Sequence, residues 1–266
     1  WNYLAGIQDR PGAANLFARG RREATGLTLA QNFLHYPLEL EPVHPRTGMP
    51  KTWRADTFGF YAARSGWEGS QEFVAQVFLK AAPIVGWSHP NAGAIQIAGL
   101  GRPWTTVREE RGGARENYSV VLLPDDEINQ GGQARLTHYA AQPDGSFSLT
   151  MDMRNVYGPR RSRAVDSMLY YTPARDPVGP ISGLRAVALD YSGKSGAPAL
   201  LVLVDQINGG GRKVWTWQKA GGTAAIRANT FSLKYGNASM QATFVPVAGL
   251  QLADENIDVQ VGTERE

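Results

Sequence analysis

The sequence predicts a mainly β protein, organised as a large antiparallel β-sandwich with a short helical segment at its N-terminal end. Thirty glycines and 16 prolines among 266 residues leave little room for long helices and predict many turns. From Asp56 onward, apolar and polar residues alternate with a period of two in one short segment after another. Because no helical pattern separates these segments, the strands are expected to pair antiparallel in a sandwich.

The N-terminal part has a different pattern. In residues 15–34 apolar residues recur at spacings of three and four, interrupted by Gly20 and Gly26, which predicts a helical segment. Residues 35–53 contain four prolines and are typical of an extended connector. We therefore expect a helical tail and proline-rich connector over residues 1–52 and one β-sandwich domain over residues 53–266.

The strands follow from the alternation, and two of the turns between them have a specific signal. Pro143-Asp144-Gly145 and Gly236-Asn237 each stand between alternating runs and predict hairpins. The segments expected to contain strands are 57–67, 72–82, 93–104, 117–123, 134–153, 167–173, 183–192, 199–207, 212–218, 229–247 and 256–262.

Composition argues against several classes of protein. A formal net charge of +3 is too small for a dedicated nucleic-acid-binding protein. The absence of cysteine leaves no disulfide, thiolate metal site or thiol nucleophile. No run of 18 apolar residues exists to span a membrane, and the first residues lack the pattern of a signal peptide. We expect neither nucleic acid nor a membrane as a partner.

The stretch from Gly86 to Trp104 carries the strongest candidate for chemistry. His89 is one of four histidines and lies in a polar group with Ser88 and Asn91, flanked by Trp87 and Trp104. Aromatic rings around a few polar groups are a common way to hold a sugar ring, and histidine is the side chain most often used for proton transfer. The alternative is a histidine that is hydrogen-bonded at the start of an ordinary strand.

Several short segments occur in the order seen in heparinase II/III-like polysaccharide lyases, and the chain resembles that family from about Trp53 to Leu252. The segments are Arg64-Ser65-Gly66-Trp67, 86–93 (GWSHPNAG), Gly101-Arg102-Pro103, 116–121 (ENYSVV) and 203–207 (LVDQI). The resemblance implies a sandwich that works with an N-terminal α/α toroid, of which residues 1–52 are the tail. It also implies a periplasmic or extracellular location.

The departures from the family pattern concern its metal ligands. The family's His-x-His-x-Asp-x-Gly segment has Trp87 in place of its first histidine and Asn91 in place of its aspartate. Glu116 replaces the histidine of a later His-Asn pair. Zinc-bearing members hold the metal with these side chains, and zinc usually takes three or four protein ligands. We therefore expect no zinc and no other cofactor.

The resemblance implies β-elimination on an acidic, uronic-acid polysaccharide, such as a glycosaminoglycan or an alginate-like polymer. His89 is the predicted catalytic residue, and the enzyme is expected to be incomplete without a toroid. The predicted substrate-binding residues are Trp87, Asn91, Arg102, Trp104, Arg115, Glu116 and Asn117. A second hypothesis stays open, in which the chain is a non-catalytic carbohydrate-binding or structural sandwich domain.

Overall fold

The computed structural model describes residues 49–69, 71–79, 90–107, 115–128, 132–158, 179–245 and 251–253. The chain divides into two compact units, Trp1–Gln218 and Lys219–Glu266. The domain boundary between residues 52 and 53 stays a prediction. The predicted helical segment 15–34 and strands 167–173 and 256–262 lie outside the described residues, as do Trp87 and His89. In the described part of the chain, no helix is long and apolar enough to cross a membrane.

The first unit contains a five-stranded antiparallel sheet in which neighbours along the chain are neighbours in the sheet. A 3₁₀ turn, η2 (Asp56–Phe58), joins the first two strands. The strands are β1 (Thr52–Ala55), β2 (Phe60–Arg64), β3 (Val74–Phe78), β4 (Ile95–Gly99) and β5 (Arg102–Pro103). Alternate residues of β2, β3 and β4 are buried, so one face of this sheet forms an interior surface.

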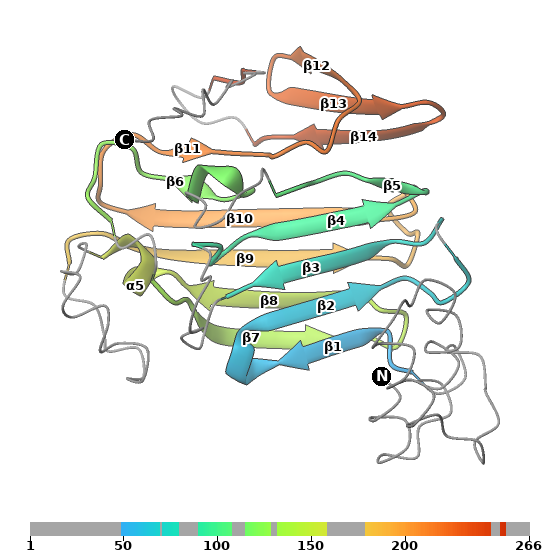
Figure 1. The fold of residues 1–266 in the computed structure, drawn as a ribbon, viewed down its shortest axis with the longest axis horizontal. Helices are drawn as coiled ribbons and strands as arrows, with labels where there is room; N and C mark the ends of the chain where they lie inside the picture. Colours follow the sequence, from blue (N-terminus) through green and yellow to red (C-terminus); the bar gives the residue numbers. More distant parts are fainter. Residues whose placement is uncertain are drawn as a thin grey trace, which may run out of the picture. The chain divides into compact units, whose positions relative to one another are not determined.

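A four-stranded antiparallel sheet supplies the opposite interior surface. Its strands lie in the order β10-β9-β8-β7, with bounds β7 (Arg135–Ala141), β8 (Phe147–Asp152), β9 (Ser182–Asp190) and β10 (Leu200–Asn208). Figure 1 shows the two sheets lying one over the other. The rings of Tyr61 and Tyr139 meet between them with centroids 5.6 Å apart, and those of Phe73 and Tyr191 lie at 6.2 Å. The predicted antiparallel β-sandwich is confirmed.

Several short elements complete the first unit. The 3₁₀ turn η3 (Arg115–Asn117) leads into β6 (Val121–Leu122), which pairs antiparallel with β11 (Val214–Trp215). The single-turn helix α5 (Arg154–Tyr157) follows β8. Tyr118 and Val120 are buried against Ala94, so the segment between η3 and β6 belongs to the core of the unit.

Both predicted hairpins are confirmed. Between β7 and β8, Gly145 N donates to Gln142 O at 3.0 Å, and Gly145 has a φ of +96°. A Cβ atom on Gly145 would overlap the backbone oxygen of Arg64, so this turn packs directly against the other sheet. A side chain is excluded here by both conformation and space.

The second unit is a three-stranded antiparallel sheet of β12 (Thr223–Arg227), β13 (Thr230–Tyr235) and β14 (Ala238–Thr243). Tyr235 pairs with Ala238, so Gly236 and Asn237 form a two-residue hairpin loop, with Gly236 at a φ of +57°.

Two strands have no counterpart in the sequence prediction. β1 lies at the boundary of the proline-rich connector, where Pro50 stands just before it. β12 contains the small residues Ala224 and Ala225, which give little alternation. Pairing with β2 and β13 makes these segments strands in spite of weak local signals.

Candidate functional site

The turn from Pro90 to Gly93 directly precedes β4 and contains one predicted binding residue, Asn91. Gly93 N donates to Phe78 O at 2.6 Å, and Ala94 N donates to Asn91 O at 2.8 Å. Gly93 has a φ of +85°, which favours glycine and lets the chain reverse tightly. The side chain of Asn91 is half-buried, and its amide has no hydrogen bond to any described residue.

Arg115 holds this turn from the interior. Its side chain is 1% exposed, and its Nη1 donates to Ala92 O at 2.9 Å and to Pro90 O at 3.3 Å. Its Nε donates to Val121 O at 3.3 Å. The prediction of Arg115 as a substrate-binding residue is corrected here, because the guanidinium is enclosed by backbone carbonyl oxygens.

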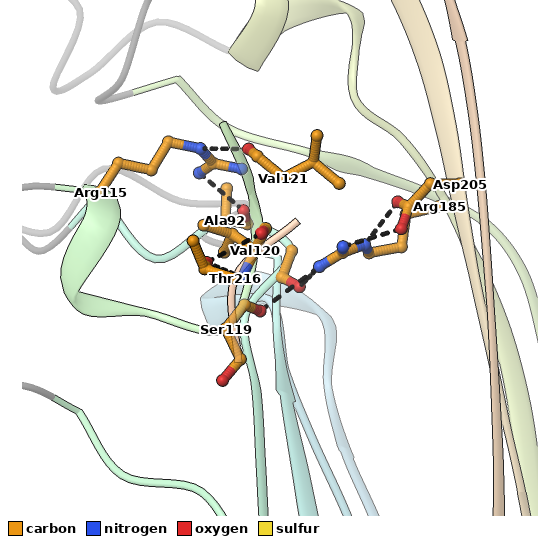
Figure 2. A network of polar contacts seen from close by, with 9 residues as sticks. Ala92, Arg115, Ser119, Val120, Val121, Arg185, Asp205 and Thr216 are labelled. Carbon is orange, nitrogen blue, oxygen red and sulfur yellow. Dashed lines mark hydrogen bonds and ion pairs between the residues drawn. The ribbon is translucent and has the colours of Figure 1, made fainter. Parts of the chain in front are cut away.

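Arg185 on β9 reaches the same turn and is also 1% exposed. Its Nη1 donates to Gly93 O at 2.6 Å and to Ser119 O at 3.4 Å. Its Nε and Nη2 bind the two carboxylate oxygens of Asp205 at 2.6 and 2.9 Å. Figure 2 shows Arg115 and Arg185 approaching Ala92 and residues 119–121 from opposite sides.

The two arginines differ in how their charge is balanced. Burial lowers the pKa of Arg115 to about 10, with Tyr157 opposing the shift and Arg185 adding to it. Burial on its own would also lower the pKa of Arg185, but attraction to Asp205 raises it above the ordinary value. Both guanidinium groups therefore carry their charge at neutral pH. Asp205 pairs directly with Arg185 and balances one of the two charges.

η3 presents two more predicted binding residues next to the turn. Arg115 begins η3, so Glu116 and Asn117 follow directly from the buried anchor. Glu116 is exposed and Asn117 is half-buried, and neither side chain is hydrogen-bonded to a described residue. Gln218 fixes the backbone here, since its Nε2 donates to Glu116 O and its backbone N donates to Ser119 Oγ at 3.0 Å.

The remaining predicted residues lie elsewhere. Trp104 is 2% exposed and its Nε1 donates to Gly99 O at 3.1 Å, so we reassign this residue from substrate binding to the core. Arg102 is exposed on β5 opposite Gly99, at the end of β4 that is distant from the Pro90–Gly93 turn. Gly99 is four steps along the strand from Ile95, a distance of about 13 Å.

Sequence reasoning missed the roles of Arg185 and Asp205. A signal for Arg185 was present, because it shares its strand face with Val187 and Leu189, which are apolar and buried. A charged residue in the apolar register of a strand indicates a buried ion pair, since an unpaired charge there is costly. Asp205 stands directly opposite Arg185 in the β9–β10 pairing.

The chemistry of this site comes from amide and carboxylate groups. Asn91 and Asn117 can each donate and accept hydrogen bonds, and Glu116 can accept them, as sugar hydroxyls and carboxylates require. Among the described residues, no three His, Asp or Glu side chains come together to hold a metal ion. One carboxylate beside two amides does not match the nitrogen and sulfur donors that zinc prefers.

The fold and site define a class of protein: an antiparallel β-sandwich in which two buried arginines bind the backbone of a turn that carries polar side chains. No protein-family model and no curated protein matches the sequence. Among solved structures, the chain is similar to the heparan sulfate lyase HepC from Pedobacter heparinus, with a TM-score of 0.53, 14% identity and coverage of 85% of this chain.

A mutant of the same HepC gives a TM-score of 0.53 at 14% identity over 86% of this chain. A heparinase III structure gives a TM-score of 0.49 at 14% identity and covers 71% of this chain and 28% of the other. The chain spans 33% of the length of HepC. At this identity the likeness establishes a shared fold.

Proposed function

We propose that this chain is the β-sandwich part of a heparinase II/III-like polysaccharide lyase that cleaves an acidic polysaccharide by β-elimination. The observation that carries the proposal is the likeness of the fold to HepC over 85% of this chain. The side chains of Asn91, Glu116 and Asn117 support it. They are half-buried or exposed, and they belong to η3 and to the turn that follows His89 in the sequence.

The reaction has three chemical requirements. The carboxylate of the uronic acid must be neutralised so that the proton on the adjacent carbon becomes acidic. A base removes this proton, the electron pair forms a carbon–carbon double bond, and the bond to the 4-linked oxygen breaks. An acid then gives a proton to the leaving oxygen. The products are an unsaturated uronate and a new chain end.

In this proposal, the chain's own residues meet the first two requirements. We assign proton transfer to His89, and orientation of the sugar ring and its carboxylate to the amides of Asn91 and Asn117. Glu116 accepts a sugar hydroxyl in this proposal, and Trp87 stacks on a ring. Arg102, at the other end of β4, binds a carboxylate or sulfate group of a more distant sugar.

The third requirement points to a further domain. Tyr118 and Tyr157 adjoin the arginine-held segments, but their side chains are only 4% and 2% exposed, so neither offers its hydroxyl to a ligand. In the proposal, an N-terminal α/α toroid supplies the acid, in keeping with a chain that spans 33% of HepC.

The reaction uses no zinc, and the protein acts in the periplasm or outside the cell, where such polymers occur.

The test is the rise in ultraviolet absorbance of unsaturated uronates with heparan sulfate, other glycosaminoglycans and alginate. His89→Ala should abolish the signal, whereas His138→Ala, the same change at an exposed position on β7, should leave it intact. Retained activity in His89→Ala would refute the assignment of His89. An inactive wild-type chain that still binds these polymers in calorimetry would favour the carbohydrate-binding alternative, unless addition of the toroid restores cleavage.

A further inference from the structure

We propose that Arg115 and Arg185 are positioning residues, which fix the Pro90–Gly93 turn so that the Asn91 amide meets the substrate in a productive orientation. The inference rests on the proposed function and deepens it. Neither arginine touches the substrate, since both are 1% exposed. They act through the backbone of the turn, and Figure 2 shows them on either side of it.

The hydrogen bonds account for every carbonyl oxygen of the turn. Arg115 donates to Pro90 O and Ala92 O, at 3.3 and 2.9 Å, and Arg185 donates to Gly93 O at 2.6 Å. The remaining oxygen, that of Asn91, accepts from Ala94 N at 2.8 Å. With its backbone fixed at four points, the turn has few alternative conformations, and the Cα–Cβ bond of Asn91 keeps one direction.

The same two guanidinium groups set the position of the turn relative to η3. Arg115 begins η3 and donates from Nε to Val121 O at 3.3 Å, while Arg185 donates to Ser119 O at 3.4 Å. Glu116 and Asn117 therefore lie in a segment that is held at Arg115 on one side and at Ser119 and Val121 on the other. The spacing between the Asn91 and Asn117 amides depends on this shared anchor.

Asp205 in turn orients Arg185. It binds Arg185 through two parallel hydrogen bonds and stands directly opposite it in the β9–β10 ladder, so the anchor belongs to the rigid sheet. Two-point binding fixes the plane of the guanidinium. Nη1 is then aimed at Gly93 O.

Stability by itself does not explain this arrangement. Buried charged groups are expensive, and replacing them with apolar side chains of similar volume is often neutral or stabilising. A guanidinium has five N–H donors in a rigid fork and can bind several carbonyl oxygens at once, which lysine cannot do. Precise placement of binding groups matters for catalysis, because a misplacement of about 1 Å can cost about 100-fold in rate.

The test is a double-mutant cycle of Arg115→Lys with Asn91→Ala, using heparan sulfate as the probe. Each single variant should lower kcat/KM, or the affinity measured by calorimetry, by about 10-fold or more. If Arg115 acts through Asn91, the double variant should be no weaker than either single variant. Losses that multiply would overturn the proposal, because they would mean that the two residues act independently.

Amide hydrogen exchange provides a readout that does not need activity. Arg115→Lys and Arg115→Met should speed exchange at the Gly93 and Ala94 amides by about 10-fold or more. The amides of the four-stranded sheet β10-β9-β8-β7 should keep their protection. Arg135→Lys, at an exposed arginine 3.7 Å from Asp152, is the matched control and should change neither exchange nor binding.

The two proposals can fail separately. Unchanged exchange in both Arg115 variants would overturn the positioning role, whatever the polysaccharide results. A wild-type chain that neither binds nor cleaves any polymer, alone or with the toroid, would overturn the proposed function and with it the catalytic purpose of the two arginines. Arg115→Met also shows whether loss of the fork alone, with the volume largely kept, is enough to release the turn.

Discussion

Arg185 and Asp205 face each other across the β9–β10 ladder and form a two-point ion pair, with N–O distances of 2.6 and 2.9 Å. The arginine side chain is 1% exposed and the aspartate side chain 18%. The carboxylate thus compensates a charge that water cannot reach. It also aims the third nitrogen of the fork at Gly93 O, which links the interior of the sandwich to the turn that carries Asn91.

Asp205→Asn is expected to lower the free energy of unfolding by about 3 kcal/mol, because it leaves the buried charge of Arg185 without a counter-charge. Urea denaturation measures the loss. The matched control is Asp125→Asn, since Asp125 pairs with Arg212 at 3.9 Å and both side chains are more than half exposed. This change should cost less than about 1 kcal/mol. Equal losses in the two variants would contradict the importance of the buried pair.

Gly145→Ala is expected to destabilise the sandwich by about 3 kcal/mol or more, because it combines a positive φ with an overlap against the backbone oxygen of Arg64. Thermal unfolding followed by circular dichroism measures the effect. Gly193→Ala is the control, with a φ of +74° and open space around the added atom, and should cost about 1 kcal/mol. Similar losses would show that the contact with Arg64 contributes nothing.

Asn91→Ala should leave stability within about 0.5 kcal/mol of the wild type, since the amide has no described hydrogen-bond partner. Under the proposed function, binding of heparan sulfate, measured by calorimetry, should fall about 10-fold or more. Asn155→Ala should lower stability and leave binding unchanged, because Asn155 Nδ2 donates to Gln133 O at 3.3 Å in a half-buried contact. Unaltered binding in Asn91→Ala would remove this residue from the site.

Asp152 makes stability depend on pH. Burial on its own would raise the pKa of this carboxyl, but hydrogen bonds from Arg154 and the charges of Arg154 and Arg135 lower it below the ordinary value. The folded state therefore binds its proton less readily than the unfolded chain does. The stabilisation is complete above the ordinary aspartate pKa of about 3.9 and is lost as the pH falls through the lowered folded-state pKa.

Asp152→Asn measures this contribution. At pH 7 the variant should unfold with about 1 to 2 kcal/mol less free energy than the wild type. The difference should shrink steadily below a pH of about 4, as the wild-type carboxyl takes up its proton. A difference that stays constant down to pH 2 would mean that the charge of Asp152 is not the source of the stability.

Much of the fold could be predicted because its signals are local. The alternation in β2, β3 and β4 depends only on neighbouring residues, and so do the turns at Gly145 and Gly236. β12 was missed because its alanines provide little apolar contrast, and the decisive interaction is pairing with β13.

For the candidate site, the structure shows where the predicted residues lie. The sequence singled out Asn91, Glu116 and Asn117, which the structure places on a turn and a 3₁₀ segment joined through Arg115. It also predicted Arg115 and Trp104 to bind substrate, as arginine and tryptophan side chains often do. Both are buried, because backbone carbonyl oxygens nearby satisfy their N–H groups.

By itself the sequence determined the strand periods, the hairpin turns and the absence of any cysteine chemistry, all of which depend on residue type and short spacing. Only the tertiary structure decided which charges are enclosed. Arg185 meets Gly93 across 92 residues of chain, and Arg115 meets Ala92 across 23. Whether a guanidinium faces water or a set of carbonyl oxygens depends on how the two sheets pack, and no local pattern of residues carries that information.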